Sequence, residues 1–240
     1  MEFIKVFADD ASYKSYRDGK GYVKPNVSLS RDSKKVYYNV DANGHECVDL
    51  GLPSGTLWAT MNVGAINPVD YGLYFQWGDV KGYTAKQVGT GDGKKKFAWG
   101  DYKWNPSGNG ATFTKYTTIG MTLELEDDAA NKNWGGDWHM PTLDQIMELI
   151  INTTSTWTAQ NGVSGKTFTS KSDNSKFIFI PAAGAASKGL VRSIGNNGGV
   201  WSSTLTNNAS DGHYLTINSG RAVAEGNNRS LGFSVRGVIG

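Results

Sequence analysis

Polar and apolar side chains alternate along the last part of the chain, and this alternation predicts antiparallel strands. The clearest stretch is GHYLTI, followed by the turn signal NSG and a second alternating segment, RAVAE. Successive side chains of a strand face opposite sides, so we expect Leu215 and Ile217 to face the core and Tyr214, Thr216 and Asn218 to face outward. The outward positions mix polar and aromatic types without repeating a reactive one, which favours recognition over catalysis.

Helical periodicity occurs in two places. In PTLDQIMELI, Thr142 and Gln145 fit a capping box, and apolar residues recur at i, i+3, i+4 and i+7, namely Leu143, Ile146, Met147 and Ile150. EDDAANKN predicts a shorter helix with Asp127 and Asp128 in its first turn, where the helix dipole favours negative charge. Short strands are expected in SKFIFIPAAG, GVWSST and GFSVRGV, and in the Gly- and Trp-rich run before residue 80. The predicted class is α+β, with two helices and mostly antiparallel short strands.

The chain divides into two regions by composition. Residues 1–40 hold strand-like pieces (FIKVF, NVSLS, KVYYN) around the turn-rich YRDGKGYVKP, which predicts a small β-rich N-terminal arm or module. Residues 41–240 form the main domain. Within it, residues 84–118 carry few strand signals but several aromatic side chains, so we expect a long loop held down by those rings, namely Phe97, Trp99, Tyr102, Trp104 and Phe113.

Composition narrows the functional classes. The 24 basic and 22 acidic residues leave a net charge of +2, which is no electrostatic footprint for nucleic acid or an anionic membrane. Cys47 is the single cysteine, so no intrachain disulfide can form, and no Cys/His set has metal-ligand spacing. No apolar run approaches the roughly 20 residues of a membrane span. The first residues lack the pattern of a signal peptide, so neither membrane insertion nor signal-directed export is expected.

Six collinear motifs carry a family resemblance: VDLGLPSGTLWATMNVGA, DYGLYFQWGD, DDAANKNWGGDWHMPT, FIPAAG, VWSST and GFSVRGV. Over residues 46–238 the chain resembles a large group of gut-bacterial and phage domains with the C-type lectin fold. It is similar within that group to the variable proteins of diversity-generating retroelements, in which a C-terminal cassette is rewritten at selected codons. Their cassette typically ends in NR followed by GFSVR, which here is Asn228, Arg229 and Gly232–Arg236.

The resemblance implies a variable region at about residues 193–232 on a fixed frame. The frame positions would be Trp201, Leu215, Ile217, Ala222, Ala224 and Phe233. The candidate ligand-binding residues are Asn196, Asn197, Asn207, Asn208, Ser210, His213, Tyr214, Thr216, Asn218, Arg221, Val223, Glu225, Asn227 and Asn228. Asparagine is a common template residue in that family, but Asn and Gly are also what turns require.

The chain departs from the chemically active relatives of the resembled group. It lacks the EPN or QPD triplet and the later WND of calcium-dependent sugar-binding lectins, and it lacks the paired cysteines of the sulfatase-modifying enzymes that share the fold. Position 139 in WHMPT is often Arg in the group, and position 61 in ATMNVGA is often Cys, so we assign no chemistry to His139 or Met61. We therefore expect no catalytic residue, no metal and no cofactor.

The expected function is ligand or receptor binding rather than catalysis, because no nucleophile, base or carboxylate pair has a recognisable catalytic motif. Tyr214 is the expected aromatic anchor, with Arg221, Glu225 and His213 giving polar selectivity. The resemblance implies a phage or prophage receptor-binding protein of the virion, or otherwise a protein of the bacterial surface. Its partner would be a protein or glycan on a bacterial cell, and a homo-oligomer is possible. The alternatives are a bacterial surface adhesin without a diversified cassette and a carbohydrate-binding module.

Overall fold

The computed structural model describes residues 4–5, 38–40 and 44–240, with side chains from residue 44 onward. It has two α-helices, α2 (Ala129–Trp134) and α3 (Leu143–Asn152), in the described residues. Short 3-10 turns are η1 (Ala85–Gln87), η2 (Trp99–Asp101) and η3 (Leu125–Asp127). The strands are β1 (Ile4–Lys5), β2 (Tyr38–Val40), β3 (Glu46–Asp49), β4 (Leu57–Asn62), β5 (Thr153–Gln160), β6 (Val163–Ser170), β7 (Phe177–Pro181), β8 (Ala185–Ser187), β9 (Leu190–Arg192), β10 (Asn197–Leu205), β11 (Asp211–Asn218), β12 (Ala222–Asn228) and β13 (Arg236–Ile239).

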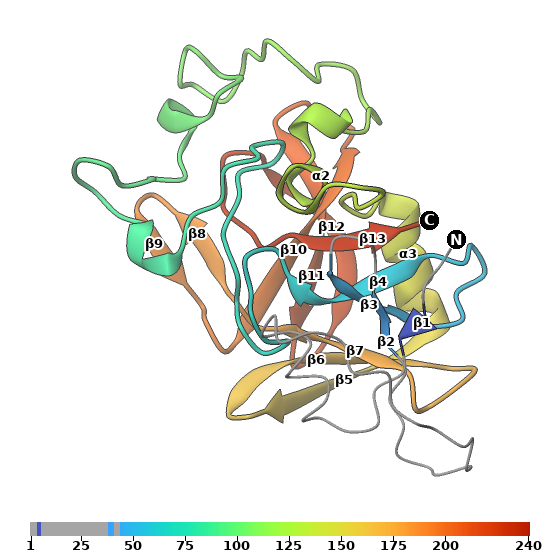
Figure 1. The fold of residues 1–240 in the computed structure, drawn as a ribbon. Helices are drawn as coiled ribbons and strands as arrows, with labels where there is room; N and C mark the ends of the chain where they lie inside the picture. The colour runs from blue at the N-terminus through green and yellow to red at the C-terminus, as the bar shows by residue number, and fades with distance from the viewer. Residues whose placement is uncertain (1–3, 6–37, 41–43) are drawn as a thin grey trace.

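The described fold is α+β, as expected, with mostly antiparallel sheets and two helices (Figure 1). A five-stranded sheet has the order β1-β2-β3-β4-β13, and three-stranded sheets have the orders β10-β11-β12 and β5-β6-β7. A two-stranded ribbon joins β8 and β9. Most of the predicted arm, residues 1–40, lies outside the described residues; its described pieces are β1 and β2, and β2 pairs with β3.

The residues just before β13 run beside β10 and join two sheets. Trp201 N donates to Ser234 O (3.0 Å), and Ser234 N donates to Gly199 O (3.1 Å). On its other side the same segment pairs Phe233 with Phe75. The predicted frame residues Trp201, Leu215, Ile217 and Phe233 are all buried, while Ala222 and Ala224 are partly buried.

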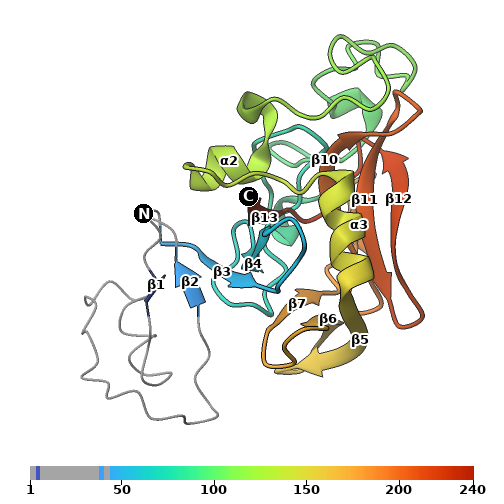
Figure 2. The same ribbon diagram turned by 90° about the vertical axis from the view of Figure 1, so that its right-hand side faces the viewer.

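Helix α3 begins as predicted and packs against the β10-β11-β12 sheet (Figure 2). Thr142 Oγ1 accepts from Gln145 N (3.2 Å), and Gln145 Oε1 accepts from Thr142 N (2.9 Å), which completes the capping box. Ile146 and Leu149 are fully buried against β11 and β6 residues. The prediction that Met147 belongs to the packed face is wrong, since Met147 is 40% exposed; the face is centred on Ile146 and Leu149 instead.

Helix α2 is also present where it was predicted, but only one of the two aspartates serves it. Asp128 is the N-cap residue, and its Oδ1 accepts from Asn131 N (2.9 Å). Asp127 precedes the helix in η3, so its placement in the first turn of α2 is wrong. Its carboxylate binds lysines of the long loop instead.

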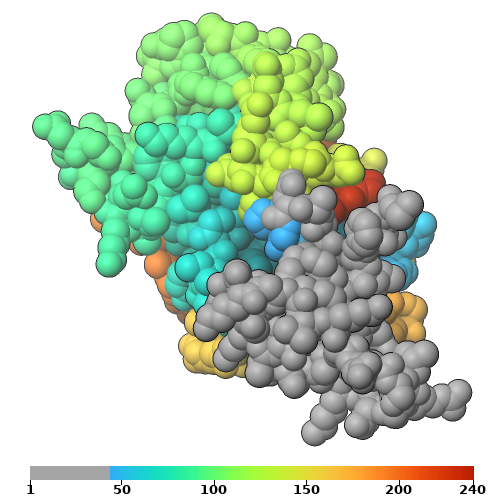
Figure 3. Space-filling model, viewed as in Figure 1, coloured from blue at the N-terminus to red at the C-terminus, as the bar shows by residue number. Residues whose placement is uncertain are grey.

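The long loop is held down by its aromatic side chains, as predicted. Between residues 84 and 122 the backbone forms only 3-10 turns and isolated bridges. Tyr102 and Trp104 are buried in one core cluster, against which Trp99 and Phe113 pack, and Phe97 is buried in a separate cluster with Tyr74. In Figure 3 its atoms (teal-green to green) extend from the left side to the top of the molecule.

The hairpin of β5 and β6 was not predicted. Its sequence, TTSTWTAQ followed by VSGKTFTS, is rich in Thr and Ser and has little apolar alternation. The two strands nevertheless pair over eight consecutive positions, from Thr153 opposite Ser170 to Gln160 opposite Val163. β-branched side chains suit the pleated surface even when they are polar.

Candidate binding surface

Half of the candidate residues lie on one face of the β10-β11-β12 sheet. In the strand register Tyr214 is opposite Glu225 and Thr216 is opposite Val223. Cross-strand partners share a face, and alternate residues return to it. This face, called the Tyr214 face below, therefore carries Tyr214, Thr216, Asn218, Arg221, Val223, Glu225 and Asn227. The opposite face, called the helix face, carries Leu215 and Ile217, which pack against α3.

The expectation that Tyr214 and Thr216 face solvent is wrong. Their side chains are 7% and 8% exposed. The Tyr214 ring stacks on Phe233, with centroids 4.6 Å apart and planes 4° from parallel, and its edge meets Trp201. The alternation separated the two faces of β11 correctly, but both are covered: one by α3, the other by the segment that precedes β13.

Gly199 makes this covering possible. The Phe233 ring lies directly over residue 199, and a Cβ built there would lie 2.4 Å from Phe233 Cδ1. A side chain at position 199 would therefore push the ring away from Tyr214. The inner part of the Tyr214 face, over β10 and β11, is aromatic and packed; the part over β12 is more open.

The open part of the face is a small polar network. Tyr214 Oη donates to Glu225 Oε2 (3.3 Å), and Arg221 Nη1 lies 2.7 Å from Glu225 Oε1. Burial raises the pKa of Tyr214, so its hydroxyl stays a neutral donor at neutral pH. The side chains of Arg221 and Glu225 are 53% and 34% exposed. Glu225 thus links a fixed tyrosine to an accessible cation.

His213 does not join this network. It lies on the helix face because residues 213, 215 and 217 alternate with Tyr214 and Thr216 along β11, and its register partner is Gly226. Its Nδ1 is buried and has no hydrogen-bond partner in the described part of the chain. Burial lowers the pKa of His213, so the ring is neutral at pH 7. The expected grouping of His213 with Arg221 and Glu225 is therefore wrong.

The candidate asparagines and Ser210 form two groups at opposite ends of the sheet. One end carries Asn207, Asn208, Ser210, Asn227 and Asn228, and the other carries Asn196, Asn197 and Asn218. The seven steps along β11 separate the ends by roughly 23 Å. Asn208 and Asn218 accept backbone N–H bonds within their turns, so turn formation accounts for those two.

Two residues that match the cassette end, Arg229 and Arg236, are structural. Both are completely buried. Arg236 donates to oxygens of Asn62, Ala59 and Phe179, and Arg229 lies against aromatic rings under the long loop. One further residue escaped the sequence analysis: Lys166 on β6 is buried, and its Nζ donates to Asn218 O (3.0 Å) at the end of the β11-β12 hairpin. Its neighbours in KTFTS gave no signal of this contact.

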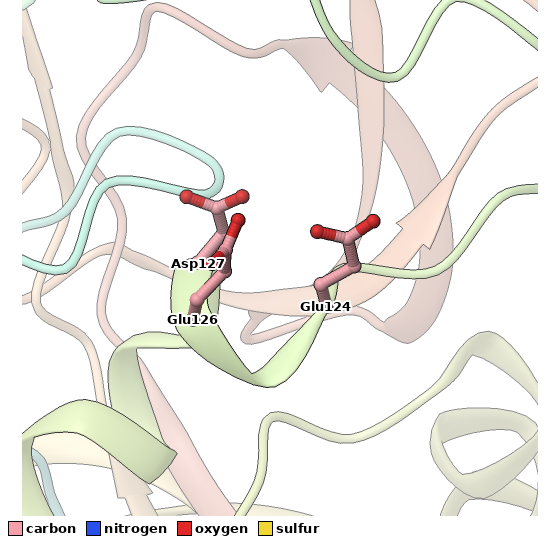
Figure 4. Close-up of side chains that lie close together, drawn as sticks. All are labelled: Glu124, Glu126 and Asp127. Atoms are coloured by element: carbon pink, nitrogen blue, oxygen red, sulfur yellow. The ribbon is translucent and has the colours of Figure 1, made fainter.

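One acidic cluster has the composition of a cation site. The carboxylates of Glu124, Glu126 and Asp127 have oxygens within 4.8 Å of one another (Figure 4). Lys115 Nζ contacts all three, at 2.6, 2.8 and 2.6 Å, and Lys103 Nζ lies 2.7 Å from Asp127. These ion pairs raise the pKa of Lys115. The ammonium group occupies the position that a bound cation would take, so we interpret the cluster as an ion-pair network that anchors the long loop.

A separate hollow lies beside the C-terminal strand. It has a volume of about 430 Å³ and is lined by Leu125, Asn131, Gly136, Asp137, His139, Ile239 and Gly240. His139 Nδ1 is hydrogen-bonded to the Asp137 backbone oxygen (3.1 Å). None of the candidate binding residues contributes to this hollow.

Comparison of the chain with protein-family models, with curated proteins and with solved structures gives no match. Among the described helices, none has the length and apolar character to cross a bilayer.

Proposed function

We propose that this protein is a ligand-binding or receptor-binding protein that displays a changeable surface on a C-type lectin-like scaffold. The observation that carries the proposal is the arrangement of β12 and of Arg221, the residue before it. Arg221, Val223, Glu225 and Asn227 alternate along one face, partly or fully open to solvent, directly beside the buried Tyr214. Substitutions at exposed positions usually change stability by less than about 0.5 kcal/mol, so such a row can vary while the frame persists.

The geometry suits a pre-organised contact surface. Tyr214 is fixed between Phe233 and Trp201, and its hydroxyl group holds the Glu225 carboxylate. Glu225 in turn orients Arg221, whose exposed guanidinium can donate to a carboxylate, carbonyl or sugar hydroxyl group of a ligand. Because these side chains are already ordered, binding loses little further conformational entropy.

The partner we propose is a protein or glycan on a bacterial surface, and the setting is a phage or prophage virion. The resemblance of the six motifs to the variable proteins of diversity-generating retroelements supports this setting. The α+β class, the two helices and the mostly antiparallel strands agree with the C-type lectin fold that the resemblance implies. The buried Arg229 and Arg236 fit a fixed cassette end next to a variable row.

Binding of the labelled protein to a panel of gut bacterial cells tests the proposal. The double variant Arg221→Ala/Glu225→Ala should lose at least tenfold in affinity for the cells that the natural chain binds. The matched control is Asp49→Ala/Lys176→Ala, which removes another partly exposed ion pair, 3.8 Å long, away from the Tyr214 face. Equal binding by the two double variants would remove the Tyr214 face from the proposal.

Natural copies of the gene test the diversification claim separately. We expect their differences to concentrate at positions 221, 223, 225 and 227 and to spare Leu215, Ile217, Arg229 and Arg236. Differences spread evenly over exposed positions of the whole domain would contradict a rewritten cassette and leave only the binding claim.

A further inference from the structure

Strand β5 (Thr153–Gln160) is a long, regular edge strand. It pairs with β6 at eight consecutive positions without a register shift, and the sheet order β5-β6-β7 places it at one edge. Within the described residues no strand pairs with its other side. Figure 2 shows β5 at the lower end of the molecule, below α3. Thr154, Ser155, Thr156 and Ala159 are exposed, so the edge is accessible.

This edge has none of the features by which proteins usually protect a strand edge. TTSTWTAQ contains no charged residue, no proline and no bulge. The other described edges differ. β12 carries the Arg221–Glu225 ion pair beside its strand, β9 has three residues and ends in Arg192, and β7 ends in Pro181 and gives its Phe179 carbonyl to Arg236. β5 alone among these offers a full row of free backbone donors and acceptors.

The side chains of β5 are complementary to a second copy of the same strand. Thr154 and Thr156 lie opposite Thr169 and Thr167 of β6, and the Thr158 and Thr167 hydroxyl groups are 2.9 Å apart. An antiparallel partner continues this threonine face only if even positions meet even positions. A two-fold axis at any residue of β5 does so, but only an axis at Thr156 pairs all three threonines of this face with threonine, because it places Thr154 opposite position 158 of the other copy and Thr156 opposite itself. Thr–Thr pairs across strands are favourable.

We infer that β5 pairs antiparallel with β5 of a second copy of this chain, centred on Thr156, to form a six-stranded sheet across a two-fold axis. The inference is independent of the proposed ligand. A pair of copies would present two Tyr214 faces, and two linked sites raise the effective affinity for a surface that carries many copies of a ligand. One strand pair is a small interface, so the dimer forms in a concentration-dependent way.

Cysteine trapping tests the register. Residues directly opposite in an antiparallel pair have Cα atoms about 4.5 to 5.5 Å apart, within the span of a disulfide. Thr156→Cys should therefore give a disulfide-linked dimer under mild oxidation. In Thr154→Cys the two cysteines would be four residues out of register, about 13 Å apart, and should link at least tenfold more slowly. The unmodified chain, with its buried Cys47, is the background. Equal linking of the two variants, or none by Thr156→Cys, would overturn the inference.

Sedimentation equilibrium of the full chain tests the dimer itself. The apparent mass should rise from 25.9 kDa toward twice that value with concentration. Thr156→Lys should raise the dissociation constant at least tenfold, whereas Thr118→Lys, which adds the same charge at an exposed loop threonine, should not. Circular dichroism checks that both variants remain folded. A natural chain that stays monomeric to about 1 mM, or a dimer unaffected by Thr156→Lys, would contradict the proposed pairing.

Discussion

Two completely buried arginines, Arg229 and Arg236, lie seven residues apart and are held in different ways. Each nitrogen of Arg236 has an acceptor: Nε donates to Asn62 Oδ1 (2.9 Å), Nη1 to Ala59 O (2.9 Å) and Nη2 to Phe179 O (3.0 Å). Burial lowers its pKa to about 9, so the guanidinium is still a cation at neutral pH. Because its acceptors belong to β4 and β7, Arg236 ties the five-stranded sheet to the β5-β6-β7 sheet.

Arg229 is held mainly by aromatic rings. Its Nη1 donates to Tyr116 O (3.1 Å), with a longer contact to Lys115 O, while Nε and Nη2 have no hydrogen-bond partner among the described residues. Its guanidinium carbon lies 4.0 Å from the Phe113 ring centroid and within 5.5 Å of the Trp77 and Tyr102 centroids. Burial alone therefore does not determine how much a charged residue stabilises a fold, and we expect the number of satisfied donors to decide it.

The largest expected effect is that of Arg236→Met. The substitution leaves the oxygens of Asn62, Ala59 and Phe179 buried without their donor, at roughly 1 to 3 kcal/mol each before relaxation. We expect a loss of about 3 to 5 kcal/mol in the free energy of unfolding, measured by urea denaturation. Arg236→Lys should recover only part of this loss, because one ammonium group cannot reproduce the planar fork. A loss below about 1 kcal/mol would show that the three bonds do not tie the sheets together.

Glu46→Gln extends the comparison to a buried carboxyl group with one satisfied oxygen. Glu46 Oε2 accepts from Thr60 Oγ1 (3.1 Å), and Oε1 has no partner in the described chain. Burial raises the pKa of Glu46 from 4.5 to about 7. The folded state therefore binds a proton that the unfolded state has released, and stability falls as the pH rises from about 4.5 to 7.

The amide of Glu46→Gln stays neutral and avoids this loss. The variant should be more stable than the natural chain at pH 8, by on the order of 2 kcal/mol, and the difference should shrink toward pH 4.5. Urea denaturation at several pH values measures it. A difference that does not change between pH 4.5 and 8 would show that Glu46 is ionised in both the folded and the unfolded chain.

Arg229→Met should have a smaller effect than Arg236→Met, although both side chains are equally buried. Methionine fills a similar apolar space between the rings and removes a desolvated cation, and it leaves mainly the Tyr116 carbonyl without a donor. Removing the desolvated cation stabilises the fold and leaving the carbonyl without a donor destabilises it, so we expect the free energy of unfolding to change by less than about 1 kcal/mol in either direction. Urea denaturation of the two methionine variants side by side gives the answer. Equal losses of stability in the two variants would show that the number of satisfied donors does not distinguish the two arginines.

The sequence predicted the elements in which apolar residues mark one face and polar residues the other. The α3 capping box, the β11-β12 hairpin and the core positions Leu215 and Ile217 follow from local patterns and are confirmed. The burial of Tyr214 could not be predicted from its own strand, because Phe233 comes from a segment that pairs with the far side of β10. The β5-β6 hairpin was missed because its alternation is between polar residues.

The candidate surface was also predicted only in part: the face that residues share was predicted, but not their exposure. Alternation placed Tyr214, Thr216 and Asn218 on one face, and the strand register agrees and adds Arg221, Val223, Glu225 and Asn227 to it. Which of them are exposed depends on what covers the sheet, and this is set by residues up to about 140 positions away, such as Phe75 and Trp77. The roles of Arg229 and Arg236 were likewise hidden, since a charged side chain in sequence gives no sign that its acceptors are backbone carbonyls of a distant loop or strand.

The smallest expected effect measures the ring contact of Arg229 directly. Phe113→Leu removes the ring closest to the guanidinium carbon but keeps an apolar side chain in its place. Combined with Arg229→Met in a double-mutant cycle, it isolates the interaction between the two residues from the packing that each loses separately. We expect a coupling of about 0.5 kcal/mol or slightly more in the free energy of unfolding. The same cycle between Phe113→Leu and Arg236→Met serves as the control and should give no coupling. If both cycles give zero, the aromatic rings only enclose Arg229, and its single hydrogen-bonded nitrogen is all that favours the charge there.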